Sequence, residues 1–460
     1  MTLPRFVGFQ SVRGSYLSYI DDGQTLAYIS DDLIASRNKF ALDPASNGED
    51  DVFNIRCCYN GKYWMPELKV DGYSTFILVV AKASQPNENE SDRTSTLFKF
   101  VLQEIGRYDI IHVSTGLFVT RDFSDNFLAL YPEDMGTLHE HWVLDWEGVV
   151  LLPKYIVFKG DNGLYLRGHS QDGYPYLRFS SSDPYSHPVG NEVFRMSDGK
   201  VRIKSLYWGK FWRCTGSWIW ADSTDTSANN HYTLFTPVQV SDNVIALKNL
   251  GEGTQFFVKR LSIDYKESCL AAKEITINKY CEMEISEYVS SRSIYNVKFR
   301  LKDSRIYGET IEVAATQDAT NDTSGYLTQT LSLAYTDEVT NTWNNTIEMK
   351  LGFGLEFSGG IPLITSAGIT VSGEISGSYS WGETLTKKTS KESSYQTIVP
   401  PKTRVKVSLI ASKGKCDIPF SYMQRDVYSD GTVKIEEHDD GIYTGLNCYS
   451  YNYEVEEQKI

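Results

Sequence analysis

Residues 347–381 read IEMKLGFGLEFSGGIPLITSAGITVSGEISGSYSW, and apolar residues alternate with small or polar ones in both halves. The apolar positions of the first half are Ile347, Met349, Leu351, Phe353, Leu355 and Phe357, and those of the second half are Ile369, Val371, Ile375, Tyr379 and Trp381. A period of two predicts β-strands with one apolar face and one small, polar face. We therefore expect a β-hairpin over about 345–382.

Residues 358–364 are expected to form the turn of this hairpin. They carry Ile361, Leu363 and Ile364, whereas hairpins of soluble proteins usually carry Asn, Asp or Gly at the turn. Each arm is about as long as the roughly 9–11 residues that a tilted strand needs to cross a bilayer. Such alternation is typical of transmembrane barrels, although an antiparallel sheet with one buried face alternates in the same way.

In the membrane interpretation, each part of the hairpin has its own environment. The turn residues Ile361, Leu363 and Ile364 would enter or cross the bilayer. The residues expected to face lipid are Met349, Leu351, Phe353, Leu355, Phe357, Ile369, Val371 and Ile375. Lys350, Glu356 and Glu374 would face the pore lumen, where two carboxylates against one ammonium favour cations.

The composition of the 460-residue chain predicts an all-β protein. The chain has 30 Tyr, 21 Phe and 9 Trp, and aromatic residues favour strands. No long window shows sustained apolar periodicity of 3.6 residues, so helices should be few and short. The length allows two to four domains.

The net charge of −14 argues against a nucleic-acid partner, because binding to phosphate needs a basic surface. It also argues against simple adsorption to anionic lipid, so attachment to a membrane would use a glycan or another neutral ligand. No charged segment followed by an apolar one opens the chain, and no apolar stretch is long enough for a membrane helix. We expect a soluble cytoplasmic precursor with reduced cysteines, although Cys416 and Cys448 could pair in an oxidising compartment.

An enzyme is not expected. The sequence has no GxSxG, HExxH or Walker motif, and no GxGxxG that opens a helix. No cofactor is expected. The stretch His139-Glu140-His141 could suggest a metal site, but a third ligand is not apparent, so no metal is expected.

A short repeat organises the first 285 residues. A glycine followed two positions later by an aromatic residue recurs at Gly14, Gly61, Gly116, Gly163 and Gly209, with a degraded sixth copy at Gly253. The copies are roughly 50 residues apart, an interval typical of repeated supersecondary units. They fall into two sets of three, which predicts modules at 1–150 and 151–285. Residues 286–460 lack the repeat and form a third, Ser/Thr-rich module.

Residues 1–285 resemble the amaranthin-type plant agglutinins. The resemblance rests on residues 59–63 (YNGKY), 83–89 (ASQPNEN), 96–99 (TLFK) and 143–146 (VLDW). It implies two β-trefoil domains that bind Gal/GalNAc-containing glycans between modules of two chains. The family's sugar-contacting loop matches the region of Asp71 to Ser74, but an amide residue expected there is absent. The sugar specificity therefore does not carry over.

The last third resembles the aerolysin family of β-pore-forming proteins. The resemblance rests on residues 358–363 (SGGIPL), 381–384 (WGET) and 399–407 (VPPKTRVKV). It implies an elongated β domain with a folded-back loop, copies of which assemble on a membrane into a shared barrel. The segment 347–381 fits that loop. Agglutinin modules fused to such a domain are typical of plant defence proteins.

Sugar rings stack their apolar faces on aromatic side chains, so we sought exposed aromatic residues beside polar ones. The predicted carbohydrate-binding residues are Tyr63, Trp64, Asp71 and Tyr73 in the first module and Trp212 and Trp218 in the second. The second cluster also contains Trp208 and Trp220. The alternative is that most of these rings belong to hydrophobic cores, which aromatic residues commonly dominate.

The sequence thus predicts two β-trefoil lectin domains followed by an aerolysin-like β domain. The predicted function is binding to cell-surface glycans, followed by oligomerisation into a transmembrane β-barrel. The homo-oligomer would be a dimer in solution or a ring on the membrane. The alternative is a non-lytic cytosolic lectin whose C-terminal module serves only as a scaffold for oligomerisation.

Overall fold

The computed structural model describes residues 3–71, 74–122, 126–133, 140–146, 148–251, 255–345, 354–428 and 431–460. In these ranges the regular structure consists of β-strands and short 3-10 helices, with no α-helix, so the expectation of an all-β chain is confirmed. The 3-10 helices are η1 (Asp22–Gln24), η2 (Ser36–Asn38), η4 (His231–Thr233) and η5 (Leu301–Asp303). No helix in the described part of the chain is long and apolar enough to span a membrane.

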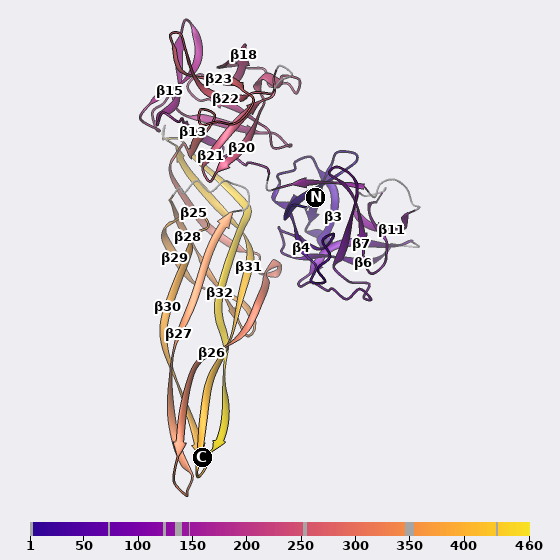
Figure 1. Cartoon of the computed structure of the whole chain (residues 1–460), viewed down its shortest axis with the longest axis vertical. Coiled ribbons are helices and arrows are strands. Elements are labelled where there is room, and N and C mark those ends of the chain that lie inside the picture. Colours follow the sequence, from indigo (N-terminus) through magenta and orange to yellow (C-terminus); the bar gives the residue numbers. More distant parts are fainter. Residues whose placement is uncertain are drawn as a thin grey trace. The chain divides into compact units, whose positions relative to one another are not determined.

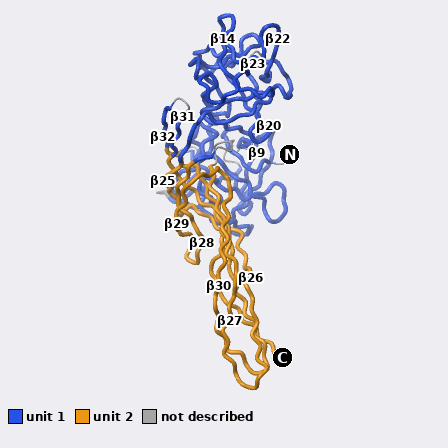
Figure 2. The backbone as a smooth tube through the Cα atoms, turned by 90° about the vertical axis from the view of Figure 1, so that its left-hand side faces the viewer, with its two compact units in different colours: residues 1–293, 346–355, 424–436 blue, residues 294–345, 356–423, 437–460 orange. Residues whose placement is uncertain are grey.

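The chain divides into two compact units, coloured blue and orange in Figure 2. Unit 1 consists of residues 1–293, 346–355 and 424–436, and unit 2 of residues 294–345, 356–423 and 437–460. Unit 1 contains two 12-stranded sheets. It also takes in residues 424–436, which the sequence had assigned to the third module.

The first sheet of unit 1 is drawn in indigo and purple in Figure 1. Its strands are β1 (Phe6–Ser11), β2 (Tyr16–Ile20), β3 (Thr25–Ser30), β4 (Phe40–Pro44), β5 (Val52–Cys57), β6 (Tyr63–Asp71), β7 (Ser74–Ala83), β8 (Leu97–Glu104), β9 (Arg107–His112), β10 (Phe118–Arg121), β11 (Leu128–Tyr131) and β12 (Glu140–Asp145).

Half of these strands close into a ring, in the order β1-β4-β5-β8-β9-β12 and back to β1. The others form the hairpins β2–β3, β6–β7 and β10–β11, which also pair with one another through β7. A closed ring of six strands capped by three hairpins is the strand pairing of a β-trefoil. The core inside it is aromatic, with the rings of Phe9 and Trp64 5.3 Å apart.

The second sheet of unit 1 has the same pairing. Its strands are β13 (Tyr155–Lys159), β14 (Tyr165–Gln171), β15 (Tyr174–Ser181), β16 (Asn191–Arg195), β17 (Val201–Ser205), β18 (Lys210–Thr215), β19 (Trp218–Ser223), β20 (Phe235–Ser241), β21 (Val244–Asn249), β22 (Phe257–Ile263), β23 (Lys266–Glu274) and β24 (Met283–Glu287). The ring is β13-β16-β17-β20-β21-β24. The hairpins β14–β15, β18–β19 and β22–β23 pair with one another through β15, β19 and β23.

The repeated glycines have a common structural role. Gly14, Gly61, Gly116, Gly163 and Gly209 each lie in the turn between a ring strand and the first strand of a hairpin, and each has a φ between +63° and +92°. Residues with a Cβ rarely adopt this conformation, which explains why the repeat keeps glycine. The sixth copy, at Gly253, lies outside the described residues.

The third sheet accounts for most of unit 2. Its strands are β25 (Val289–Phe299), β26 (Arg305–Asn321), β27 (Leu327–Asn345), β28 (Leu355–Thr365), β29 (Gly368–Tyr379), β30 (Thr384–Val399), β31 (Thr403–Tyr428) and β32 (Val433–Lys459). Their order is β29-β28-β25-β31-β32-β27-β30, and β26 pairs with β31. Several of these strands are much longer than those of unit 1 (Figure 1).

The predicted hairpin is present, but its turn is not where the sequence placed it. β28 continues through residues 358–364, and the turn is at Ser366 and Ala367, followed by Gly368 with φ +112°. Ile361, Leu363 and Ile364 therefore lie within a strand, so their assignment to the turn was wrong. Alternating apolar residues continue the strand, whereas Gly368 supplies the backbone conformation that the reversal requires.

The left-handed conformation of Gly209 gives a prediction. A Cβ at this position would meet no heavy atom within 4 Å, so only backbone strain opposes a side chain there. We expect Gly209→Val to lower the free energy of unfolding by roughly 1–2 kcal/mol, the usual cost of a left-handed residue. Gly209→Asn is the matched control, because Asn tolerates this conformation. Chemical denaturation followed by tryptophan fluorescence measures both, and a Val variant as stable as the Asn variant would contradict the role given to the glycines.

Candidate functional site

The β28–β29 hairpin hides part of its apolar surface in this conformation. Leu355, Phe357 and Ile364 are each 2% exposed, whereas Ile361 and Leu363 are partly exposed. The buried positions alternate up to Gly359 and then shift by one residue to Pro362 and Ile364. Space is tight at the shift, because a Cβ on Gly360 would lie 2.5 Å from the Val371 side chain.

Aromatic rings of unit 2 cover Phe357. Its ring centroid lies 5.2 Å from Trp343, 5.6 Å from Tyr379 and 6.3 Å from Trp381. Trp343 also packs against Tyr443 at 5.2 Å. This aromatic cover removes from water an apolar side chain that would otherwise be exposed.

Two side chains of β32 hold the backbone of β28. The Asn447 amide accepts a hydrogen bond from the Ile364 N–H and donates one to the Ile364 carbonyl, both at 2.9 Å. The Tyr443 hydroxyl lies 2.8 Å from the Pro362 carbonyl and 2.6 Å from Asn341 Oδ1. Burial raises the pKa of Tyr443, so its hydroxyl stays protonated. Asn447 thus takes the place of a neighbouring strand, and we call its two hydrogen bonds to Ile364 the Asn447 clasp.

β29 lies at the edge of the sheet and is largely exposed. Val371 is 45% exposed, while Ile369 and Ile375 are partly buried. Gly373 and Gly377 have φ of +72° and +143°, which interrupts the regular extended backbone. Irregularities of this kind protect an exposed edge from pairing with other chains.

The predicted lumen residues are exposed where they are described. Glu356 lies on the exposed face of β28, and Glu374 accepts a hydrogen bond from the Ser358 hydroxyl at 2.7 Å. The remaining predicted hairpin residues Met349, Lys350, Leu351 and Phe353 lie outside the described residues.

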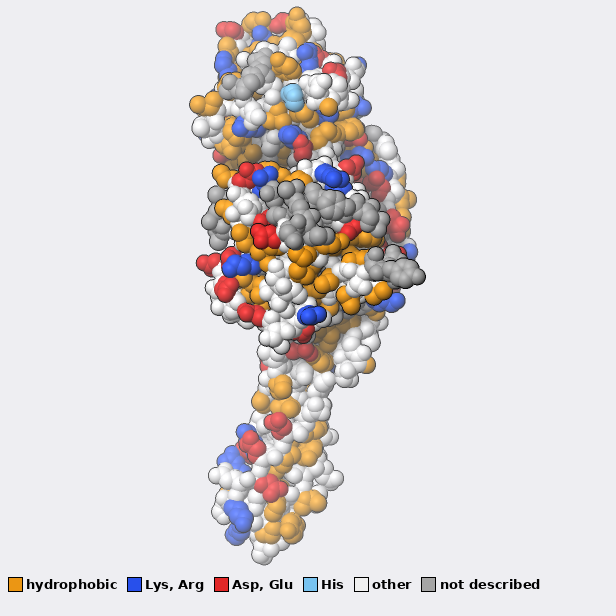
Figure 3. All heavy atoms as spheres, turned by 90° about the vertical axis from the view of Figure 1, so that its right-hand side faces the viewer, with side chains coloured by type: hydrophobic (Ala, Val, Ile, Leu, Met, Phe, Trp, Pro, Cys, Tyr) orange, Lys and Arg blue, Asp and Glu red, His pale blue; other side chains and the backbone are white. Residues whose placement is uncertain are grey.

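The strands that flank the hairpin, β27 and β30, pair continuously from Leu327 and Val399 to Thr342 and Thr384. They are rich in Ser and Thr, and most of β30 is exposed. Uncharged side chains and backbone cover much of the long strands on the face shown in Figure 3.

The first predicted sugar cluster is not assembled on the surface. Trp64 is fully buried in the core of the first trefoil, and Tyr63 is 4% exposed with its hydroxyl donating to Asp43 at 2.9 Å. Trp64 is a core residue, because its ring packs against Phe9, Phe40 and Phe98. Asp71 ends β6, and Tyr73 lies outside the described residues.

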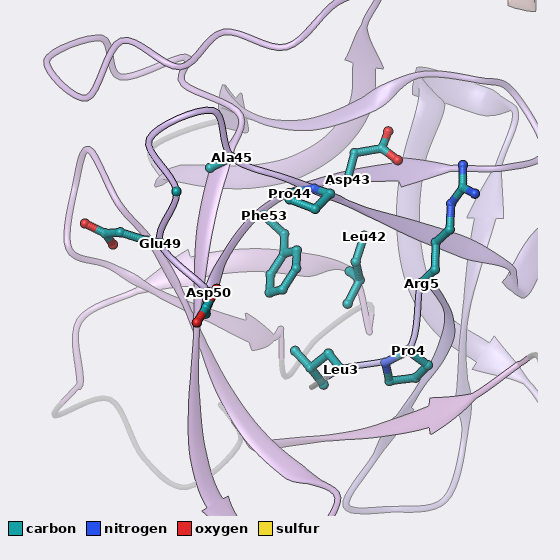
Figure 4. A pocket seen from close by; sticks show the side chains of 11 residues that line it. Leu3, Pro4, Arg5, Leu42, Asp43, Pro44, Ala45, Glu49, Asp50 and Phe53 are labelled. Carbon is teal, nitrogen blue, oxygen red and sulfur yellow. The ribbon is translucent and has the colours of Figure 1, made fainter. Parts of the chain in front are cut away.

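A pocket of about 480 Å³ lies beside this trefoil's N-terminal strand. Leu3, Leu42 and Phe53 point toward one another inside it, and Glu49 points away (Figure 4). None of the predicted sugar residues lines it.

The second predicted cluster divides into core and surface. Trp212 is fully buried, and its indole donates to Asn191 Oδ1 at 3.1 Å. Trp218 and Trp220 share one face of β19 and are only partly buried. The Trp218 ring, predicted to bind a sugar, is therefore partly accessible. Trp212, predicted to do the same, is a core residue.

Trp218 and Trp220 belong to a larger aromatic group that sequence reasoning missed. The Tyr174 ring stacks on Trp220 at 4.5 Å with an interplanar angle of 22°, and Tyr176 lies edge-on to both tryptophans. Lys266 Nζ lies 4.9 Å from the Tyr265 ring and 5.6 Å from Trp218. We call this group the hairpin-tip patch and define it by Tyr174, Tyr176, Trp218, Trp220, Tyr265 and Lys266.

The patch was missed because its tyrosines are scattered along the sequence. The available signal was the position of Tyr174 directly after Asp172-Gly173 and of Tyr265 directly after Asp264, where tight turns are expected. Asp172, Gly173 and Asp264 all have positive φ.

The described residues contain no group of three or more His, Cys, Asp or Glu that could hold a metal ion. His141 is instead a buried structural residue, since Nε2 donates to the Val119 carbonyl and Nδ1 faces the Tyr28 hydroxyl. All seven cysteines, each in a described segment, are free thiols, including Cys416 and Cys448.

Two family models match the chain. Residues 150–286 match the Agglutinin domain, and residues 274–454 match the Clostridium epsilon toxin ETX/Bacillus mosquitocidal toxin MTX2 family. The chain therefore combines an agglutinin domain with an aerolysin-like toxin domain, as the sequence predicted. No catalytic family is indicated by either match.

Among curated proteins, Natterin-1 of Thalassophryne nattereri is 24% identical over 181 residues, which covers 39% of this chain and 51% of that protein. Natterin-2 of the same species is 23% identical over 181 residues, which covers 39% of this chain and 48% of that protein. The chain thus spans about half the length of the curated relatives it matches.

Among solved structures, the lamprey immune protein has a TM-score of 0.33 at 14% identity, covering 68% of this chain and 93% of that one. The hemolytic lectin CEL-III has a TM-score of 0.31 at 11% identity, covering 97% of this chain and 93% of that one. Because both scores are low, the fold assignment rests on the strand pairing and the two family matches.

The Asn447 clasp gives a second prediction. Asn447→Ala leaves the buried N–H and C=O of Ile364 without their partners, and each unsatisfied buried group costs about 1–3 kcal/mol. We expect hydrogen–deuterium exchange of residues 355–379 to accelerate about tenfold or more, because the hairpin opens more often. The exposed Asn452→Ala is the control and should leave this exchange unchanged. Equal exchange in both variants would show that the clasp does not hold the hairpin.

Proposed function

We propose that this chain, which joins an agglutinin domain to an aerolysin-like toxin domain, binds glycans and inserts its β28–β29 hairpin into a membrane after assembly. The observation that carries the proposal is the hairpin itself, with alternating apolar residues whose buried face rests on the chain's own aromatic rings. A surface of that kind suits two environments, the cover that it has here and the lipid of a bilayer.

The position of the hairpin favours its release. β29 is an edge strand, and β28 pairs with β25 on its other side, so the hairpin can leave without dividing the rest of the sheet. The interactions to be broken are the pairing of β28 with β25, the Asn447 clasp, the Tyr443 contact and the packing around Phe357.

Burial of the hairpin's apolar side chains in lipid would offset the loss of these interactions. Each large apolar side chain moved from water into an apolar environment contributes about 1.5–3 kcal/mol. Hairpins from several copies must pair with one another, because a bilayer accepts a sheet only as a closed barrel without free edges. Assembly therefore precedes insertion, and the chain acts as a homo-oligomeric ring on the membrane.

The hairpin's exposed carboxylates would then line the lumen. Glu356 and Glu374 lie on exposed faces of their strands here, and a ring of such groups favours cations. The lipid-facing set remains the apolar one, including Leu355, Phe357, Val371 and Ile375.

The agglutinin domain directs the protein to its target. We propose that it binds glycans and concentrates the chain at a surface before assembly. The rival proposal is a lectin scaffold that oligomerises, at most as a dimer, without insertion. Release of dye from glycan-bearing liposomes separates the two, since the scaffold would bind such liposomes and leave them sealed.

Two neighbouring residues of β29 give the sharpest test. Val371 is 45% exposed and lies on the apolar face, whereas Ser372 is exposed on the opposite face. A cationic residue on the lipid face of a barrel costs ~2–4 kcal/mol per strand at mid-bilayer. We expect Val371→Arg to reduce dye release by tenfold or more and Ser372→Arg to retain most of it.

Both variants should keep the soluble fold, which circular dichroism and thermal unfolding check. Leu355→Arg is a poorer test, because Leu355 is 2% exposed and the charge would disrupt the soluble fold as well. Equal release by Val371→Arg and the unmodified chain would overturn the assignment of the two faces. Absence of release by the unmodified chain on glycan-bearing liposomes would favour the scaffold.

A further inference from the structure

We propose that the hairpin-tip patch of the second trefoil is the carbohydrate-binding site of this chain and takes a hexopyranose through its apolar face. This inference rests on the proposed glycan binding and deepens it by naming the surface. The patch lies within residues 150–286, the segment that matches the Agglutinin domain.

The patch is built where three hairpins meet. Tyr176 of β15 pairs with Trp220 of β19, Trp218 of β19 pairs with Ala271 of β23, and β15 also pairs with β23. β14, β22 and β23 lie close together in Figure 2. Rings from all three hairpins therefore lie on one surface that the sheet holds in place.

Two of the rings are well exposed and lie over a buried one. Tyr265 is 64% exposed and Tyr174 is 49% exposed, while Tyr176 beneath them is 2% exposed. Tyr176 therefore acts as a support for Trp218 and Trp220, and Tyr174 and Tyr265 present free surface. An accessible group of large aromatic rings indicates a binding site more than a core.

The polar groups around the rings suit hydroxyl ligands. Lys266 places its ammonium among Tyr176, Trp218 and Tyr265, within 5.9 Å of each ring centroid. Gln171 donates to the Tyr265 carbonyl at 3.0 Å, which holds the turn that presents Tyr265. An apolar platform with a few polar groups beside it is the arrangement that small polar ligands require.

The chemistry favours a sugar over a lipid surface. Tyr and Trp also occur at membrane interfaces, but Arg178 and Glu267 form an ion pair at 2.9 Å on the strands that carry the patch. Arranged charges beside aromatic rings fit a ligand whose hydroxyl groups alternate with an apolar ring face.

The second trefoil's β18–β19 tip corresponds in strand order to the β6–β7 tip of the first trefoil, between Asp71 and Ser74. The patch adds to Trp218 the rings of Tyr174 and Tyr265, which come from the neighbouring hairpins.

The test compares glycan binding by the full-length chain and its variants. A printed array of neutral and acidic oligosaccharides identifies the best probe, and titration calorimetry with that oligosaccharide gives the affinity. We expect Tyr174→Ala with Tyr265→Ala to weaken binding by about tenfold or more, as removal of aromatic anchors usually does. Tyr185→Ala is the control, because Tyr185 is 51% exposed in the same trefoil and outside the patch.

A second readout follows the tryptophans. Bound sugar should shift the emission of the unmodified chain to shorter wavelength and protect it from acrylamide quenching, and Trp218→Phe should reduce both effects. Unchanged affinity in the double tyrosine variant would overturn the assignment of the patch while leaving glycan binding intact. Binding of no array glycan by the unmodified chain would overturn both. Loss of binding to glycan-free liposomes in the tyrosine variant, with sugar affinity unchanged, would assign the patch to lipid instead.

Discussion

The packing of Phe357 against Trp343, Tyr379 and Trp381 is the contact that covers the apolar face of the β28–β29 hairpin. A strand with apolar residues at alternate positions cannot remain in water unless that face is covered. The chain covers it with its own aromatic rings and, through Asn447 and Tyr443, hydrogen-bonds the same strand's backbone. Leu355 and Phe357, which are buried in this conformation, are among the residues that the proposed function places in lipid.

The contacts that hold the β28–β29 hairpin determine both how stable it is in this conformation and how readily it can leave the sheet. The hairpin is held from one side by β25 and by side chains of β32, whereas β29 has an open edge. Under the proposed function, the hairpin would leave by breaking its pairing with β25 and its contacts to β32, and the rest of the sheet would keep its pairing. The positive-φ glycines of β29 reduce the risk that the open edge pairs prematurely with another chain.

In unit 1 a different constraint governs the fold. The glycines at the turns let ring strands connect to hairpins, and the closed rings leave no edge at either trefoil's barrel. The two cores bury many of the aromatic residues, Trp64 and Trp212 among them. Tyr174 and Tyr265, at the tips of hairpins, stay accessible, which is why the candidate sugar site lies there and not at the tryptophans that the sequence made most prominent.

The sequence by itself determined the strands, the repeat and the combination of a lectin-like part with a toxin-like part. The strands depend on local alternation, the repeat on glycines with positive φ, and the two parts on family-specific stretches. Only the tertiary structure decided which rings are buried. Trp212 and Trp218 lie on consecutive strands, yet the first is fully buried in the core and the second is only partly buried. It also decided the turn at Ser366 and Ala367, since an apolar stretch such as residues 361–364 is compatible with a turn or a strand until its partners are known.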